Sequence, residues 1–168
     1  MQEAAPPGFQ IGGHYRVESD MSGIDDALAQ LPAFPGTVRV GRDGGLLSHL
    51  SVWKNLSLPL EYHARDAQHI AEDVSLLFVL CGEDRATLPR FLEKYPDVLS
   101  AYEKRLAGFI RALLLEPEVL VLDDVFDGLS DREKEKVLHW GSVFHLRFPF
   151  RTLLYRGQTM PDESKGAA

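Results

Sequence analysis

Two adjacent aspartates, Asp123 and Asp124, end a short apolar run and are the residues best suited to chemistry. The run from Val119 to Leu122 is long enough for one buried strand and too short for a helix. A strand that is apolar on both faces fits a parallel sheet covered by helices, so the two acids should lie at its carboxyl edge, where open α/β sheets bind ligands. There they are suited to hold a magnesium ion and to polarise a water molecule. The alternative is a buried strand that leaves the core through a polar turn.

A helix is predicted directly before this strand. Ser100 is its expected N-cap, and Glu103, three residues later, completes the pattern of a capping box. The helix then carries one apolar face at helical spacing, formed by Leu106, Phe109, Ile110, Leu113 and Leu114. Pro117 is expected to stop the helix before the strand begins.

Residues 99–129 resemble the part of ABC-transporter ATPases that runs from the signature motif through Walker B to the D-loop. The flanking Arg-Ala-Leu and Glu-Pro pieces match the family in type and spacing. The signature of the family, Leu-Ser-Gly-Gly-Gln, corresponds to Leu99, Ser100, Ala101, Tyr102 and Glu103. The Asp-Glu pair that ends Walker B corresponds to Asp123 and Asp124. Asp123 is therefore the expected metal ligand, and Asp124 stands where the family has its catalytic glutamate.

The resemblance extends upstream, so that it covers about residues 36–131. Residues 41–62 are similar to the Q-loop segment of the family. Their sequence most resembles that of the ATPases of Mla/Mce-type phospholipid transporters. Two further helices, Ile70–Cys81 and Leu88–Tyr95, agree with the helical subdomain of such an ATPase. The resemblance implies an α/β fold, a reduced P-loop-type parallel sheet with a helical subdomain over about residues 60–110.

Length and composition fit one globular domain over residues 11–160, between disordered tails at residues 1–10 and 161–168. At 168 residues the chain is shorter than a full ABC ATPase domain. The early β-subdomain and the C-terminal strands and helices are the expected missing pieces. A net charge of −7 argues against nonspecific nucleic-acid binding. With no run of 18 apolar residues and no cleavable signal, we expect a cytoplasmic chain that reaches the inner membrane only through a partner.

The phosphate-binding loop of the family, Gly-x-x-x-x-Gly-Lys-[Ser/Thr], does not occur in the sequence. Residues 19–28 are its best positional candidate, with Ser22 and Gly23 in the loop and Asp25 where the lysine belongs. A carboxylate ~4–5 Å from a polyphosphate is repulsive by a few kcal/mol at an effective dielectric near 20. The segment is read equally well as an ordinary helix N-terminus whose acids complement the dipole. Both interpretations predict that it repels anions.

Other catalytic positions of the family have changed as well. Arg42 stands at the Q-loop glutamine, and Arg156 stands at the switch histidine after a predicted strand, Thr152–Tyr155. Asp124 is one methylene shorter than the catalytic glutamate, which draws a general base away from its water. Geometry errors of about 1 Å can cost on the order of a hundredfold in rate.

The signature and the D-loop differ too. Ala101 and Tyr102 replace glycines whose absent side chains let the backbone approach a γ-phosphate, and Ser130 replaces the D-loop aspartate. A tyrosine side chain is hard to accommodate at such an approach. Ser100 keeps its type, and since helix N-termini favour anions, it is the residue expected to reach a partner's nucleotide.

Three functions follow from these residues. The favoured one is a degenerate ATP-binding subunit, a pseudo-ATPase that is a structural or regulatory partner of a lipid-type permease or of an intact ATPase, as a homodimer or a heterodimer. In that case no cofactor is expected. The first alternative is a working ATP-binding subunit of a phospholipid transporter, which would use ATP and Mg²⁺ with Asp124 as a weak general base. The second alternative is a free-standing adaptor with the same fold.

Overall fold

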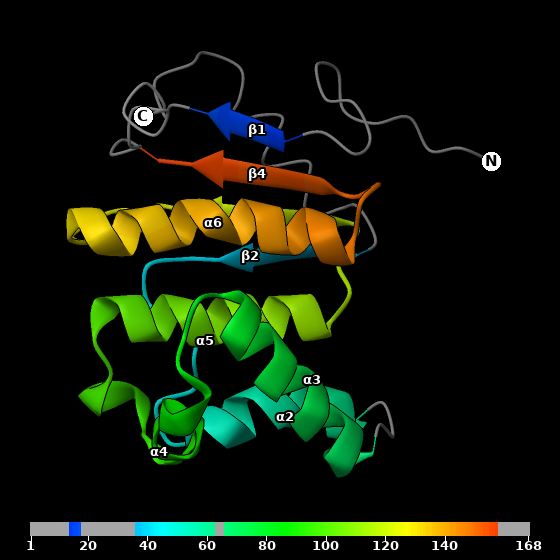
Figure 1. Ribbon diagram of the computed structural model, residues 1–168, viewed down its shortest axis with the longest axis vertical. Coiled ribbons are helices and arrows are strands. Elements are labelled where there is room, and N and C mark those ends of the chain that lie inside the picture. Colours follow the sequence, from blue (N-terminus) through cyan, green and yellow to red (C-terminus); the bar gives the residue numbers. More distant parts are fainter. Residues whose placement is uncertain (1–13, 18–35, 63–65, 158–168) are drawn as a thin grey trace.

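A parallel sheet forms the centre of the computed structural model, which describes residues 14–17, 36–62 and 66–157. Within these residues the sheet has four strands in the order β1-β4-β3-β2. Their bounds are β1 His14–Val17, β2 Thr37–Val40, β3 Val119–Asp123 and β4 Thr152–Arg156. Because all neighbours pair in parallel, the strands end at one common edge (Figure 1). The α/β fold with a parallel sheet is confirmed.

Five α-helices accompany the sheet in the described part of the chain. They are α2 Val52–Tyr62, α3 Ala67–Leu80, α4 Leu88–Glu93, α5 Ala101–Leu114 and α6 Asp131–Arg147, with 3-10 turns η2 Arg85–Thr87 and η3 Pro96–Val98. Helix α6 lies along the sheet, whereas α2, α3 and α4 gather at the end of the molecule farthest from β1 (Figure 1). None of the described helices is both long and apolar enough to cross a membrane.

The predicted helix bounds are close to those observed. Helix α3 begins three residues before the expected Ile70, because the Asp66 side chain caps it by accepting a hydrogen bond from the Gln68 N–H. Helix α5 ends at Leu114, three residues before Pro117. Its predicted capping box is confirmed: Ser100 Oγ accepts from the Glu103 N–H, and Glu103 accepts from the Ser100 N–H.

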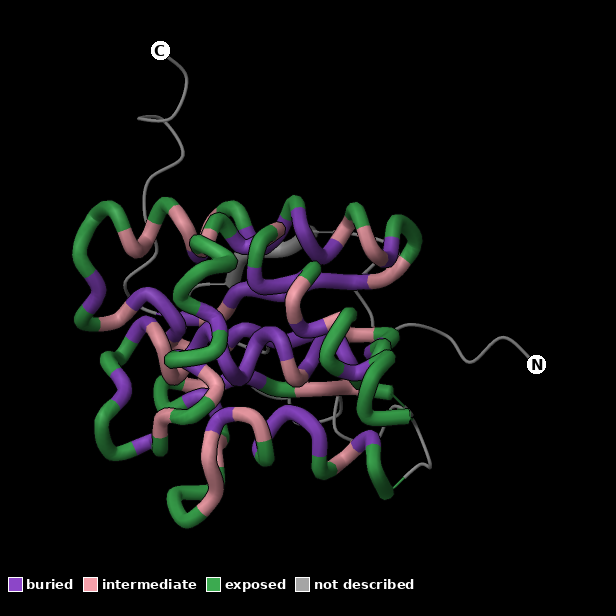
Figure 2. Tube along the Cα trace, turned by 60° about the horizontal axis from the view of Figure 1, so that its bottom comes forward, coloured by how far each residue is buried: buried purple, intermediate pink, exposed green. Residues whose placement is uncertain are grey.

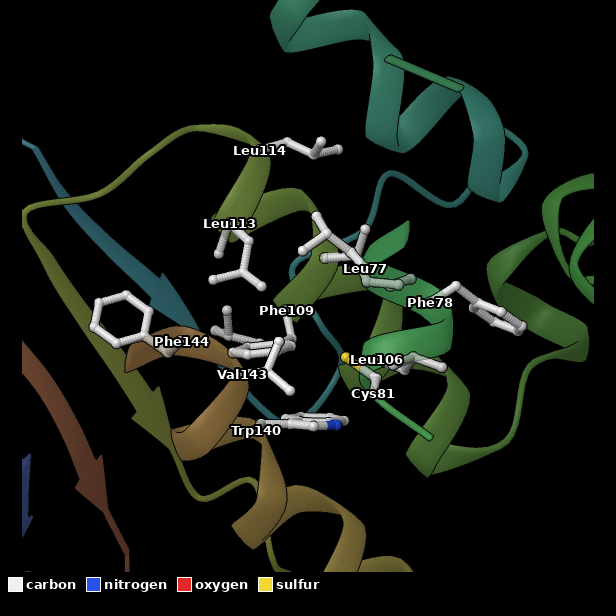
Figure 3. Close-up of a cluster of buried hydrophobic side chains, with 14 of the residues drawn as sticks. Leu77, Phe78, Cys81, Leu106, Phe109, Leu113, Leu114, Trp140, Val143 and Phe144 are labelled. Atoms are coloured by element: carbon white, nitrogen blue, oxygen red, sulfur yellow. The ribbon is translucent and has the colours of Figure 1, made fainter. Parts of the chain in front are cut away.

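The apolar face of α5 fills the space between α3 and α6 (Figure 3). All five predicted face residues, Leu106, Phe109, Ile110, Leu113 and Leu114, are buried. Trp140 of α6 stacks on Phe109 with ring centroids 4.7 Å apart. Buried positions lie at the centre of the molecule and exposed ones on its outer turns (Figure 2). Helix α5 is therefore the element that joins the helical layer to the sheet.

The loop of residues 41–50 is held to α2 by one buried amide. Asn55 Oδ1 accepts from the Leu47 N–H at 2.7 Å, and Asn55 Nδ2 donates to the carbonyl oxygens of Leu47 and Leu50. Asn55 is 2% exposed, so these bonds satisfy its polar atoms away from water. The loop that carries Arg42 is thereby fixed at its far end.

Cys81 is a free, buried thiol that follows α3. Burial raises the pKa of the thiol, so it stays protonated at neutral pH, and the thiolate is the reactive species. We expect iodoacetamide to alkylate native Cys81 more than about tenfold more slowly than the urea-unfolded chain. Mass spectrometry of the modified chain measures both rates. Equal rates would mean that the thiol is accessible in the native state.

Candidate functional site

The carboxyl edge of the sheet carries an ion pair between neighbouring strands. Asp123 of β3 is the register partner of Arg156 of β4. Arg156 Nη1 lies 3.3 Å from both Asp123 Oδ1 and Asp123 Oδ2. Both side chains are about one-quarter exposed, so water screens their attraction only in part. The residue at the switch-histidine position is thus in contact with the residue at the metal position.

Asp124 follows directly and has a constrained backbone. Its φ of +52° is uncommon for a residue with a side chain, and its N–H donates to the Arg156 carbonyl at 2.7 Å. A Cβ on Gly157 would lie 2.8 Å from Asp124 Oδ1, so the chain after β4 passes close to this carboxylate. The conformation turns the chain out of the sheet toward Asp127.

Arg42 approaches the same acids from the loop after β2. Arg42 Nη1 lies 3.1 Å from Asp127 Oδ2, and Arg42 Nη2 lies 3.9 Å from Asp124 Oδ2. The Arg42 side chain is 61% exposed, so these are surface pairs. The residue at the Q-loop position therefore contacts the residue at the catalytic-glutamate position through charge.

Arg105 of α5 holds the loops on either side of the site together. Its Nε donates to the Arg42 carbonyl at 3.0 Å, and its Nη1 donates to the carbonyls of Val125 at 3.0 Å and Asp127 at 2.7 Å. Arg105 is 3% exposed. Burial lowers the pKa of its guanidinium, and the Asp127 charge acts in the opposite direction. This buried cation positions both Arg42 and Asp127.

The charges at this edge cancel. Three carboxylates, Asp123, Asp124 and Asp127, face three guanidinium groups, Arg42, Arg105 and Arg156. The described residues contain no group of three or more His, Cys, Asp or Glu side chains placed to hold a metal ion by themselves. A magnesium ion at Asp123 needs carboxylate oxygens that a fixed guanidinium already contacts. The residues present at this edge do not fit Mg²⁺.

The predicted signature residues lie apart from this cluster. Ser100 and Ala101 are exposed at the start of α5. The Tyr102 side chain turns into the helical layer. It is buried, and its hydroxyl donates to Glu83 Oε1 at 2.6 Å. In the described part of the chain no hydrogen bond or ion pair joins Ser100, Ala101 or Tyr102 to the two Walker B acids.

A tyrosine was expected to be hard to accommodate at position 102. In the structure its side chain is accommodated within the helical layer. Burial and the adjacent Glu83 carboxylate raise the pKa of the Tyr102 hydroxyl, so it remains a donor. Lys136 Nζ contacts the same Glu83 oxygen at 2.8 Å and lies 5.3 Å from the Tyr102 ring centroid. Ser130, at the D-loop position, caps α6.

The predicted phosphate-loop residues Ser22, Gly23 and Asp25 lie outside the described residues, as do both predicted tails. Two residues of the cluster were missed by sequence reasoning, Arg105 and Asp127. Arg105 stands four residues before Phe109, in line with the apolar face of α5. A charged residue on a buried stripe is the signal that would have found it.

Comparison with known proteins gives relatives in one functional group. A sulfate/thiosulfate import ATP-binding protein of Nephroselmis olivacea is 32% identical over 108 residues, 64% of this chain and 30% of that protein. A methionine import ATP-binding protein of Vibrio cholerae is 34% identical over 93 residues, 55% of this chain and 26% of that protein. A molybdate/tungstate import ATP-binding protein of Pyrococcus abyssi is 27% identical over 133 residues, 79% of this chain and 37% of that protein.

A solved structure has the same fold. It is a dimeric ATP-binding cassette in a post-hydrolysis state with ADP and Pi, with a TM-score of 0.61 and 19% identity over 80% of this chain and 57% of that one. No protein-family model matches the chain. The chain spans 26–37% of the length of the three curated relatives. The relatives named here are all ATP-binding proteins for import, which agrees with the resemblance of residues 36–131 to ABC-transporter ATPases, and the solved structure shares the fold.

Proposed function

We propose that this chain is a degenerate ABC-transporter ATP-binding subunit, a pseudo-ATPase that acts as a structural or regulatory partner. One observation carries the proposal: the Arg156 guanidinium contacts both carboxylate oxygens of Asp123. A metal ion that binds Asp123 has to displace the Arg156 guanidinium from the carboxylate. Because Arg156 is on the neighbouring strand, its positive charge then remains close to the metal ion. Arg42 likewise places positive charge near Asp124.

The partners follow from the relatives and the structural neighbour. The relatives' names describe ATP-binding proteins for import, and the neighbour is a dimer. We therefore propose a permease or an intact ATPase subunit as the partner, reached from the cytoplasmic side of the membrane. The Mla/Mce-type lipid assignment rests on residues 41–62 alone. The relatives named above serve sulfate, methionine and molybdate, so the lipid cargo stays a prediction.

Calorimetric titration of the purified chain with ATP and Mg²⁺ tests the proposal. We expect no binding in the micromolar range, because the cation position is already filled by Arg156. The variant Arg156→Gln removes that cation and should increase the affinity of the chain for Mn²⁺ severalfold. Arg85→Gln, an exposed arginine on η2, is the matched control and should change nothing. Micromolar ATP–Mg²⁺ binding by the unaltered chain would overturn the pseudo-ATPase proposal.

A working ATP-binding subunit is the second candidate, and the names of the relatives favour it. ATP binding together with metal-dependent phosphate release would establish it. Co-purification with a membrane permease from a detergent extract would support either transporter function and would exclude a free-standing adaptor. The two measurements together separate the three functions.

A further inference from the structure

Three polar contacts tie α3 and the turn after it to α6. They run antiparallel along the two helices and join Asp73 to Arg147 at 3.5 Å, the Leu80 carbonyl to His139 Nε2 at 3.1 Å, and Glu83 to Lys136 at 2.8 Å. Helix α3 belongs to the helical layer of α2, α3 and α4, whereas α6 lies along the sheet (Figure 1). These contacts therefore cross a seam between the helical layer and the layer that covers the sheet.

Two of the three contacts at this seam are weak. The Asp73 and Arg147 side chains are each 32% exposed, and His139 is exposed, so water competes for both contacts. Polar interfaces between units of one chain resemble transient interfaces, and relative motion is the ordinary expectation across them. A fixed arrangement of the two layers at this seam therefore depends on the third contact, the one at Glu83.

The Glu83 carboxylate is held from two other helices. The Tyr102 hydroxyl of α5 donates to Glu83 Oε1 at 2.6 Å, and Lys136 Nζ of α6 donates to the same oxygen at 2.8 Å. The Glu83 side chain is 18% exposed, so solvent screens these contacts less than the other two. Hydrogen bonds to an ionised group are shorter and roughly twice as strong as those between neutral groups. One carboxylate thus joins the turn after α3 to both α5 and α6.

The ring of Tyr102 adds packing to the same contact. Tyr102 is 6% exposed, and its ring centroid lies 5.8 Å from that of Trp140 and 5.3 Å from Lys136 Nζ. Both of these partners belong to α6, and Trp140 also faces Phe109 of α5 (Figure 3). A glycine at position 102 would supply neither the ring nor the hydroxyl. The residue that departs from the family signature is therefore the one that completes the contact across the seam.

We propose that Tyr102 is a conformational latch, which holds the helical layer against α6 in one arrangement through Glu83 and Lys136. The starts of α5 and α6 then keep a fixed geometry without any nucleotide, which suits a structural partner. Like the proposed function, on which it rests, the latch assumes that position 102 no longer serves a nucleotide. Because its test uses no nucleotide, ATP–Mg²⁺ binding would overturn the proposed function without changing the distances measured in the free chain.

Electron–electron resonance between two spin labels on the full chain tests the latch. The labels are attached at Arg85→Cys on η2 and Glu135→Cys on α6, two exposed positions on opposite sides of the seam, and mass spectrometry checks that the buried Cys81 is not labelled. We expect one narrow distance distribution. Tyr102→Phe, which removes only the hydroxyl, should broaden the distribution or add a second distance. Glu83→Gln, which keeps the shape and removes the charge, should act in the same direction.

Hydrogen exchange separates a latch from general stabilisation. In Tyr102→Phe we expect the amides of η2 and α4 to exchange about tenfold faster, while those of β3 and β4 stay within about twofold of their original rates. The matched control Tyr95→Phe removes the hydroxyl of a half-exposed tyrosine near α4 and should change neither measurement. Several distances in the labelled chain that keeps Tyr102, an unchanged distribution in Tyr102→Phe, or equally faster exchange in the strands would each overturn the proposal.

Discussion

Replacing Gly44 with alanine is expected to lower the free energy of unfolding by about 3–5 kcal/mol, among the larger effects of a single substitution. A Cβ at this position would lie 2.0 Å from the Lys104 carbonyl oxygen and 2.8 Å from its carbonyl carbon. Both atoms belong to the backbone of α5, so the loop and the helix would have to separate. Gly44 also has a φ of +69°, which a residue with a side chain adopts at a cost. Urea unfolding followed by circular dichroism measures the change.

Gly45→Ala is the matched control for this substitution. Gly45 also has a positive φ, +62°, but the nearest atom to an added Cβ is Arg111 Nη2 at 3.0 Å, the movable end of a side chain. We expect a loss of about 1–2 kcal/mol there, from backbone conformation alone. The difference between the two variants gives the energy of the close approach. If the two variants lose the same stability, the packing of the loop on α5 is not tight.

The elements that position the site were predictable because each depends on local chemistry. The capping box at Ser100 and the run from Val119 to Leu122 both act within a few residues of sequence, and both were found at their expected positions. The order of the strands in space fixes which acids and arginines meet. Asp123 meets Arg156 only because β3 and β4 are neighbours in register, which no local pattern contains.

The side-chain directions were less predictable. Tyr102 was interpreted from its place in the signature motif, where the family has a glycine. A tyrosine side chain there was expected to hinder the approach of the backbone to a γ-phosphate. Tyr102 instead turns inward, since Glu83 accepts its hydroxyl and Trp140 lies 5.8 Å from its ring. Glu83 lies in the loop between α3 and η2, and Trp140 lies in α6, so both partners come from other parts of the sequence. The close contact of Gly44 with α5 was missed for the same reason, because its partners are 60 or more residues away.

Replacing Arg105 with methionine is expected to lower the free energy of unfolding by about 3–5 kcal/mol, because a buried guanidinium that donates three hydrogen bonds to backbone carbonyls is lost. Methionine fills a similar space but donates no hydrogen bonds. The carbonyl oxygens of Arg42, Val125 and Asp127 would then lose the donors that now satisfy them. A buried acceptor that is left unpaired costs about 1–3 kcal/mol. Urea unfolding again gives the magnitude.

Arg42→Met is the control, since it removes an arginine from the same cluster but leaves the Arg42 carbonyl in place. The Arg42 side chain is 61% exposed, and surface ion pairs contribute about 0–1 kcal/mol, so its loss should be small. Arg105→Lys keeps the charge but replaces the planar fork with a compact ammonium group, which cannot span three carbonyls from two loops. We expect this variant to lie closer to Arg105→Met than to the unaltered chain. If Arg105→Lys is as stable as the unaltered chain, the positive charge alone is enough to hold the two loops together. The hydrogen-bond geometry of the Arg105 guanidinium would then not be needed.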